Sequence, residues 1–209
     1  MRSTTEKLSL TRDFFARPAD VVAPELLGAE LIVDAGTKGQ VVARVVEVEA
    51  YLGADDSASH AYRGPTKRSA IMFGPAGRLY VYLSYGMHHC VNVVTGVDGV
   101  ASAVLLRAAE VVSGIQVVRA RRNAPSAEAR ALLSGPGNLG KGLGLSLSDN
   151  GVDLVEGPSR ISCRLRGVAF PIERTPRIGI SSAVEAPLRF VLSGHPAASA
   201  GRSQRVCVD

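Results

Sequence analysis

The sequence predicts an α+β fold, in which a single domain of residues 1–209 combines a mostly antiparallel β-sheet with flanking helices and a β-hairpin. Valine-rich segments with period-two alternation recur along the chain, as expected of strands. Helical segments do not alternate regularly with these strands, so a parallel sheet is not indicated. No repeat, linker or low-complexity tract divides the chain, and its 46% hydrophobic content suffices for one core.

The first half of the chain has four recognisable segments. Residues 18–28 predict a short helix that ends at a glycine, and residues 29–33 and 41–51 predict strands. Residues 53–77 are rich in Gly, Pro, Ser and Asp and are too long for a plain connection. Long loops of this kind are usually functional or disordered.

Residues 78–94 predict a β-hairpin. Two β-prone runs, LYVYLS and HCVNVV, flank Tyr85, Gly86 and Met87, and Gly86 can supply a positive φ. We therefore expect Tyr85 near the tip. A further strand is expected over residues 101–110, closing at Arg107. The elements expected after it are helices over 114–122 and 127–133, a glycine-rich loop, and short strands within 159–167 and 187–194.

The composition indicates in which cellular compartment we expect the protein and whether we expect it to bind a metal. No apolar run approaches the roughly 20 residues of a membrane span, and residues 1–15 lack the apolar segment of a secretory signal. Cys90, Cys163 and Cys207 are widely spaced and are expected to be free thiols of a reducing compartment. No cluster of His and Cys has metal-ligand spacing. We therefore expect a soluble, cytoplasmic protein without a metal.

The chain carries 24 Lys and Arg against 19 Asp and Glu, and arginine predominates among the cations. This balance permits a nucleic-acid partner but does not demand one. Positive charge gathers in residues 119–130, where a solvated helix face is the simplest interpretation. A second pair of cations, Lys67 and Arg68, lies in a turn-like segment.

Glu47, Glu49 and Tyr51 share one face of the strand over residues 41–51. That face is apolar where the strand begins and acidic where it ends. Two interpretations are open: the acidic end forms the floor of a pocket, or it belongs to an edge strand that reaches water. The pattern alone favours the second.

Polar residues elsewhere in the hairpin region are ambiguous by themselves. Asn92 lies in a valine-rich strand, so its amide either satisfies a local backbone irregularity or faces a ligand. Tyr80 and Tyr82 share a face, where tyrosine is usually a packing residue. A lone histidine such as His60 is more often structural than catalytic.

Taken together, these segments resemble the alkyladenine (3-methyladenine) DNA glycosylase family. The matching motifs are VEVEAYLGADDSASHAYRGPTKRSAIMFGPAGRLYVYLSYGMHHCVNVV, then AVLLRAAE, SGPGNLGKGLGLS and TPRIGISSAVEAPLRF, with DFFARPADVVAPELLGAELIV before them. Their order is kept over nearly the whole chain, which makes the resemblance specific. It implies a curved sheet with a protruding hairpin.

The resemblance implies a bacterial enzyme of base-excision repair that acts on double-stranded DNA containing damaged purines. Such an enzyme flips out alkylated or deaminated purines, of the 3-methyladenine and hypoxanthine type, and hydrolyses the N-glycosidic bond to leave an abasic site. We expect a monomer that needs no cofactor.

The resemblance also assigns roles to individual positions. The catalytic glutamate falls on Glu49, assisted by Arg107 and by the backbone of Ile178, and the intercalating tyrosine falls on Tyr85. The base pocket falls on Tyr51, His60, Tyr82 and Asn92. Contacts to the DNA backbone are expected at Lys67, Arg68 and Lys141. Because Lys67 suits a phosphate contact better than a Schiff base, we expect no lyase step.

Two other function classes compete with this interpretation. Residues 135–141, GPGNLGK, match the phosphate-loop patterns GxxxxGK and GxGxxG of nucleotide-binding enzymes. However, a helix rather than a strand is predicted before them, and Gly142 holds the position of the magnesium ligand. A non-enzymatic protein that uses Tyr85 as a wedge in DNA is the second alternative, against which the presence of Glu49 argues.

Overall fold

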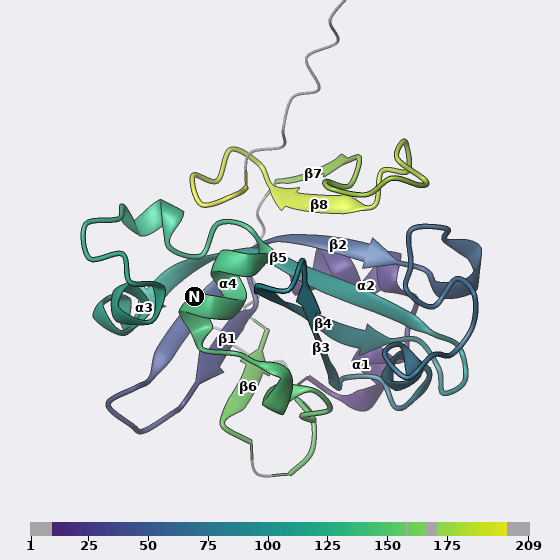
Figure 1. Cartoon of the computed structure of the whole chain (residues 1–209), viewed down its shortest axis with the longest axis horizontal. Coiled ribbons are helices and arrows are strands. Elements are labelled where there is room, and N and C mark those ends of the chain that lie inside the picture. The colour runs from purple at the N-terminus through teal and green to yellow at the C-terminus, as the bar shows by residue number, and fades with distance from the viewer. Residues whose placement is uncertain (1–9, 158, 166–170, 200–209) are drawn as a thin grey trace, which may run out of the picture.

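The computed structural model describes residues 10–157, 159–165 and 171–199. Its eight strands form one curled sheet in which every paired neighbour is antiparallel (Figure 1). The fold is therefore α+β, as the sequence predicts. The strands are β1 (Glu30–Val33), β2 (Val41–Tyr51), β3 (Leu79–Ser84), β4 (His88–Thr95), β5 (Ser102–Ser113), β6 (Ile161–Arg164), β7 (Ile172–Thr175) and β8 (Arg189–Leu192).

Four short α-helices accompany the sheet: α1 (Arg12–Phe15), α2 (Ala19–Leu26), α3 (Ile115–Arg122) and α4 (Pro136–Leu143). In Figure 1, α4 lies in front of the sheet and α2 behind it. Four 3-10 turns complete the described elements: η1 (Gly53–Asp55), η2 (Ala70–Phe73), η3 (Ala129–Ala131) and η4 (Leu147–Asp149). No helix of the described residues is long and apolar enough to cross a membrane.

Strand β2 is central in the sheet. One of its edges pairs with β5 along its length, and β1 and β8 share the other edge, at residues 41–44 and 47–49. Glu47 and Glu49 are therefore fully buried. The edge-strand interpretation of the acidic strand end is wrong, because β8, from near the end of the chain, covers that edge.

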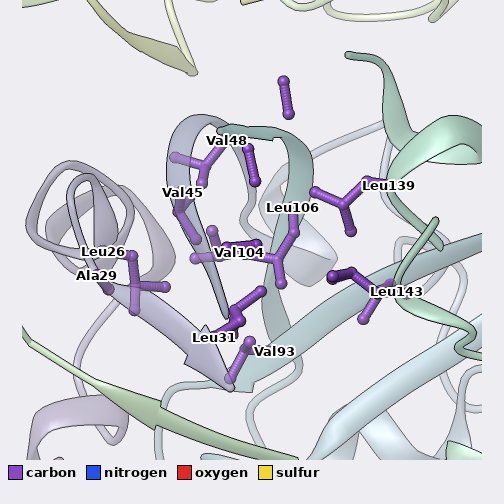
Figure 2. Close-up of a cluster of buried hydrophobic side chains, with 14 of the residues drawn as sticks. Leu26, Ala29, Leu31, Val45, Val48, Val93, Val104, Leu106, Leu139 and Leu143 are labelled. Carbon is purple, nitrogen blue, oxygen red and sulfur yellow. The ribbon is translucent and has the colours of Figure 1, made fainter. Parts of the chain in front are cut away.

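Aliphatic side chains from both sides of the sheet pack into one core (Figure 2). Leu26 of α2, Val48 of β2, Val104 of β5 and Leu139 of α4 are each at most 1% exposed. Full burial of one such side chain contributes about 1.5–3 kcal/mol to stability. Packing of these side chains therefore fixes the positions of β2 and β5, the strands that carry the polar residues described below.

The hairpin expected over residues 78–94 is confirmed. β3 and β4 pair with Tyr80 opposite Asn92, and Met87 N–H donates to the carbonyl oxygen of Ser84 across the turn. Tyr85 and Gly86 have φ angles of 48° and 68°. The left-handed region is costly for a tyrosine, so this turn presents Tyr85 outward at the expense of some backbone strain.

Strand β5 does not close at Arg107 but continues to Ser113. Val111 still pairs with Ala43 of β2, and Glu110 receives a hydrogen bond of 2.9 Å from Arg44. These cross-strand contacts extend the ladder, so Arg107 lies inside the strand rather than at its end.

The helix expected over residues 127–133 is replaced by the short turn η3. Arginine side chains satisfy backbone carbonyls of this segment: Arg119 donates to Ala127 and Arg122 donates to Ala131. The arginines of α3 are therefore partly buried and fasten the segment, so the interpretation as a solvated helix face is wrong for them; Arg130, on η3, is exposed.

The segment expected as a glycine-rich loop is the helix α4. A Cβ at Gly140 would lie 2.1 Å from the carbonyl oxygen of His89, and one at Gly142 would lie 2.4 Å from the Leu133 side chain. The glycines let the helix approach the sheet closely. Because the helix begins at Pro136, inside the motif, and the turn η3 precedes it, the phosphate-loop context is not met.

Candidate active site

A cavity of about 310 Å³ opens beside the end of β2. Its wall comes from β2, the segment over residues 53–77, the strands β3, β4 and β5, and residues 179–182. Its volume is at the lower end of the range for small-molecule sites, about 300–1,000 Å³. Six residues to which the resemblance assigns a role line it: Tyr51, His60, Arg68, Tyr82, Tyr85 and Asn92.

Glu49 lies directly behind this wall. The hydroxyl of Tyr51, a lining residue, donates a hydrogen bond of 3.0 Å to Oε2 of Glu49. The backbone N–H of Ile178 donates to Oε1 at 2.8 Å. The carboxylate is fully buried yet only one side chain away from the cavity.

Arg107 joins the two acidic side chains of β2. Its Nε lies 2.8 Å from Oε1 of Glu47, and its Nη1 lies 3.3 Å from Oε1 of Glu49. Nη1 also donates to the carbonyl oxygen of Ile178 at 3.5 Å. The structure thus brings together Glu49, Arg107 and Ile178, the three residues that the resemblance places at the reacting atoms.

The two carboxyl groups titrate differently. Burial raises the pKa of Glu49 above its ordinary value of 4.5, although the charge of Arg107 and the N–H of Ile178 act against this. Burial acts on Glu47 in the same sense, but Arg107, Arg189 and Ser199 outweigh it and lower its pKa. Neighbouring carboxyls whose pKa values are pushed apart are typical of sites that use one of them as an acid or base.

Glu47 is the centre of a network that the sequence pattern did not reveal. Its Oε1 accepts from Arg189 Nε at 2.7 Å and from Ser199 Oγ at 2.7 Å, and its Oε2 accepts from Ser199 N at 2.5 Å. Arg189 and Ser199 come from the end of the chain, and only the pairing of β8 with β2 brings them here. These contacts support a structural role for Glu47.

The aromatic side of the cavity is built by His60, Tyr80 and Tyr82. The His60 ring stands nearly perpendicular to Tyr82, with centroids 4.7 Å apart, and Nδ1 lies 2.9 Å from the Tyr80 hydroxyl. Partial burial and the charge of Arg68 lower the pKa of His60 to about 4. His60 is therefore neutral at physiological pH.

Tyr51 is held from behind by a buried ion pair. The Arg177 guanidinium lies over its ring, with Cζ 4.7 Å from the centroid. Arg177 makes two hydrogen bonds to Asp56, of 2.5 and 2.8 Å, and one of 3.0 Å to the carbonyl oxygen of Ala50. Sequence reasoning missed this pair, because its members lie 121 positions apart.

Asn92 satisfies both interpretations that the sequence left open. Its Nδ2 donates to the carbonyl oxygen of Tyr80 at 3.0 Å, so the buried amide has a backbone partner. It also lines the cavity.

The tip of the hairpin projects apolar side chains away from the core. Tyr85 is 87% exposed and Met87 is 70% exposed. Large apolar side chains exposed side by side often mark an interaction surface. Tyr85 also lines the cavity, so this surface adjoins the cavity mouth.

The three cations expected at the DNA backbone occupy different settings. Lys67 is exposed and is not among the residues that line the cavity. Arg68 lies in the cavity wall, with its Cζ 4.4 Å from the ring centroid of Tyr82. Lys141 lies on α4, where it lines a separate surface hollow with Met87 and His89.

Neither described cysteine has the low pKa of a nucleophile. Burial raises the pKa of Cys163 to about 12 and also raises that of Cys90. Both are free thiols, and Cys207 lies outside the described residues. The described residues contain no group of three or more His, Cys, Asp or Glu side chains suited to a metal ion.

Known proteins of one kind match this chain. The family model described as Methylpurine-DNA glycosylase matches residues 13–196. A Corynebacterium glutamicum protein named "Putative 3-methyladenine DNA glycosylase" is 50% identical over 189 residues, covering 90% of this chain and 95% of its own. Proteins with the same name from Nocardia farcinica and Methanoculleus marisnigri are 53% and 44% identical, and cover 86% and 90% of this chain. The matches cover 85% and 96% of those two relatives.

The fold, the buried carboxylate beside an aromatic cavity and these matches define the class of protein, a hydrolase that acts on N-glycosyl bonds. The chain belongs to the methylpurine-DNA glycosylase family. Its broad function is accordingly DNA base-excision repair.

Proposed function

We propose that this enzyme flips alkylated or deaminated purines, of the 3-methyladenine and hypoxanthine type, out of double-stranded DNA and hydrolyses their N-glycosidic bond. The observation that carries the proposal is the position of Glu49, one hydrogen bond behind Tyr51 in the wall of the aromatic cavity. This arrangement places a carboxylate next to a space suited to a planar base.

The hairpin tip supplies the means to extrude a nucleotide. The glycosidic carbon cannot be reached inside a duplex, and extrusion of a nucleotide costs a few kcal/mol. An apolar wedge that fills the vacated space compensates for the lost stacking. Tyr85 is suited to this role, because it is 87% exposed on a turn that adjoins the cavity.

The cavity then holds the extruded purine between rings. Tyr51, His60 and Tyr82 present π-faces and edges, and stacking of a base on an aromatic side chain contributes about 1–3 kcal/mol. With Nδ1 of His60 against the Tyr80 hydroxyl, Nε2 either donates or accepts a hydrogen bond according to the tautomer. It can thus meet a carbonyl or an amine at position six of the purine.

Asn92 excludes undamaged guanine in this proposal. Its bond to the Tyr80 carbonyl fixes the amide in the cavity wall, where it crowds the exocyclic amine on the minor-groove edge of guanine. Selection by a clash adds to selection by stacking.

Glu49 activates the water. Oε1 faces Ile178 N–H and Arg107, whereas Oε2 accepts one hydrogen bond from the described residues, that of Tyr51. A carboxylate oxygen has two lone pairs, so Oε2 can accept a second hydrogen bond, from water. The ionised carboxylate takes a proton from this water as the water oxygen attacks the anomeric carbon and the purine departs. The carboxylate also stabilises positive charge that develops on the sugar. Arg107 and the backbone N–H of Ile178 hold the carboxylate in place.

Simple hydrolysis is favoured over a lyase reaction. A lyase step needs an amine beside the sugar, and Lys67 is exposed and not among the residues that line the cavity. A β-elimination product that disappears in Lys67→Ala would contradict this part of the proposal.

Release of free base tests the function. Duplexes containing one hypoxanthine or 3-methyladenine are incubated with the protein, and the free base and the abasic site are quantified. The proposal expects both products in equal amounts. ATP hydrolysis without base release would instead support a nucleotide-binding enzyme, and lesion binding without release would support a non-enzymatic damage-binding protein.

Action as a monomer and location in the bacterial cytoplasm stay predictions. Light scattering of the protein, alone and with a lesion-containing duplex, measures its oligomeric state. One protein copy per lesion is the expected result, and a stable dimer would contradict it.

A further inference from the structure

Arg68 places a cation in the wall of the cavity. It is the one charged side chain among the described residues that line the cavity, and its guanidinium lies over the ring of Tyr82. The nearby guanidinium groups of Arg107 and Arg177 form ion pairs with buried carboxylates. Within the described ranges, no acidic side chain forms an ion pair with Arg68. Its charge therefore acts on whatever enters the cavity.

We propose that Arg68 is a specificity residue that disfavours positively charged purines relative to neutral ones. The inference rests on the proposed function, because it takes the cavity as the site of the extruded purine. It differs from the sequence expectation, in which Arg68 contacts the DNA backbone.

The charge of the lesion decides the effect. Methylation of an adenine at ring nitrogen N3 leaves the base with a formal positive charge, whereas hypoxanthine is neutral. We consider two positive charges about 8 Å apart, with an effective dielectric constant between that of a protein surface and that of water. Their repulsion lowers the occupancy of the cavity by a cationic purine by about 2- to 30-fold. Arg68 is exposed to solvent, which favours the lower part of this range.

The guanidinium also competes for the ring that a cationic base would use. The face of a tyrosine attracts a cation, and Arg68 already lies 4.4 Å from the Tyr82 centroid. A neutral purine depends less on this attraction. Both effects act in the same direction, against the charged lesion.

The field of Arg68 already reaches the groups around the cavity. Next to burial, its charge is the cause that lowers the pKa of His60. A side chain that disfavours a proton on His60 also disfavours a cationic ring packed against it.

Lys67 is the matched control for Arg68. It is the preceding residue and carries the same charge, but it is not among the lining residues. Contacts to phosphate strengthen binding of every sequence and every lesion alike, and their loss makes the salt dependence of binding shallower. A phosphate contact and a base-selecting cation therefore have different signatures.

The test compares single-turnover release of 3-methyladenine and of hypoxanthine from otherwise identical duplexes, with spontaneous loss subtracted. Arg68→Met removes the charge and keeps the apolar stem, Arg68→Gln is a second neutral variant, and Arg68→Lys keeps the charge. We expect both neutral variants to raise the ratio of 3-methyladenine to hypoxanthine release by about 2- to 30-fold. Arg68→Lys should keep the wild-type ratio, and Lys67→Met should weaken both activities without changing it.

An unchanged or lower ratio in the neutral variants overturns the inference. If the salt dependence of binding is also shallower in them, Arg68 is a phosphate contact, as the sequence suggested. Failure of the proposed function is a separate result, because wild-type protein would then release neither base. Thermal unfolding of each variant confirms that the ratio is measured on folded protein.

Discussion

The backbone N–H of Ile178 donates a hydrogen bond of 2.8 Å to Oε1 of Glu49, which joins two positions 129 residues apart. The preceding residue, Arg177, is fastened to Asp56 and packs on the ring of Tyr51. The segment that orients the carboxylate therefore also holds the ring that separates it from the cavity. Correct placement of Glu49, the proposed general base, therefore depends on this segment as much as on β2.

The raised pKa of Glu49 predicts the acid limb of the pH–rate profile. A general base acts when ionised, so the single-turnover rate should rise with pH through a limb that lies above the ordinary value of 4.5. The pKa of His60, about 4, lies below this limb. His60→Gln should therefore leave the limb in place. A limb near pH 4 that vanishes in His60→Gln would assign it to the histidine instead.

Removal of the Glu47 carboxylate should destabilise the fold. Glu47→Ala leaves Arg189 without its buried carboxylate and leaves Arg107 with Glu49 alone, at a cost of about 3–5 kcal/mol in the free energy of unfolding by denaturant. Glu110→Ala is the control, since it removes a half-exposed ion pair with Arg44 that contributes about 0–1 kcal/mol. Equal losses in the two variants would contradict a special role for the buried network.

The same network predicts a pH dependence of stability. Because the pKa of Glu47 is lowered on folding, its contribution is present above the pKa of an unfolded glutamate and is lost as the pH falls through the folded value. Wild-type protein should therefore lose more stability than Glu47→Gln between neutral pH and pH 3, measured by urea unfolding. Parallel curves for the two proteins would show that other groups dominate acid unfolding.

Tyr85→Ala should separate DNA distortion from folding. The side chain is 87% exposed, so stability should change by less than about 0.5 kcal/mol. Loss of the wedge should lower hypoxanthine release from a duplex by roughly tenfold or more, and much less from single-stranded DNA, where extrusion costs little. An equal loss on both substrates would point to a role in the cavity rather than in the duplex.

Asn92→Ser should relax discrimination against guanine. The shorter side chain no longer crowds an exocyclic amine, so slow release of undamaged guanine should become measurable from a G·T mismatch. Hypoxanthine release serves as the internal reference, since it reports any general disturbance from the lost bond to the Tyr80 carbonyl. If guanine stays untouched while hypoxanthine is still released, exclusion depends on another residue.

Alternation and turn chemistry were sufficient to predict β2, the hairpin and the outward position of Tyr85, because these are local properties of the chain. Local patterns could not show that β8 covers the edge of β2, so they favoured a solvent-facing end for a strand whose Glu49 is fully buried. They also misjudged α4, since glycine disfavours a helix unless close packing requires it.

The partners of the site residues depended on contacts between distant segments. Two ion pairs form only when the sheet brings distant segments together: Asp56 with Arg177, and Glu47 with Arg189. No spacing in the sequence predicts either pair. The resemblance pointed to the residues that surround the cavity. It did not distinguish Arg68, which lies in the cavity wall, from Lys67, which is not among the lining residues.

The most direct test of the account is single-turnover release of hypoxanthine from duplex DNA by wild-type protein and by Glu49→Gln. Glutamine keeps the shape of the side chain but cannot accept the proton of water, so release should fall by about 10²- to 10⁴-fold. Affinity for the lesion-containing duplex should stay close to wild type. If Glu49→Gln releases the base as fast as wild type, Glu49 is not the general base and the central claim is wrong.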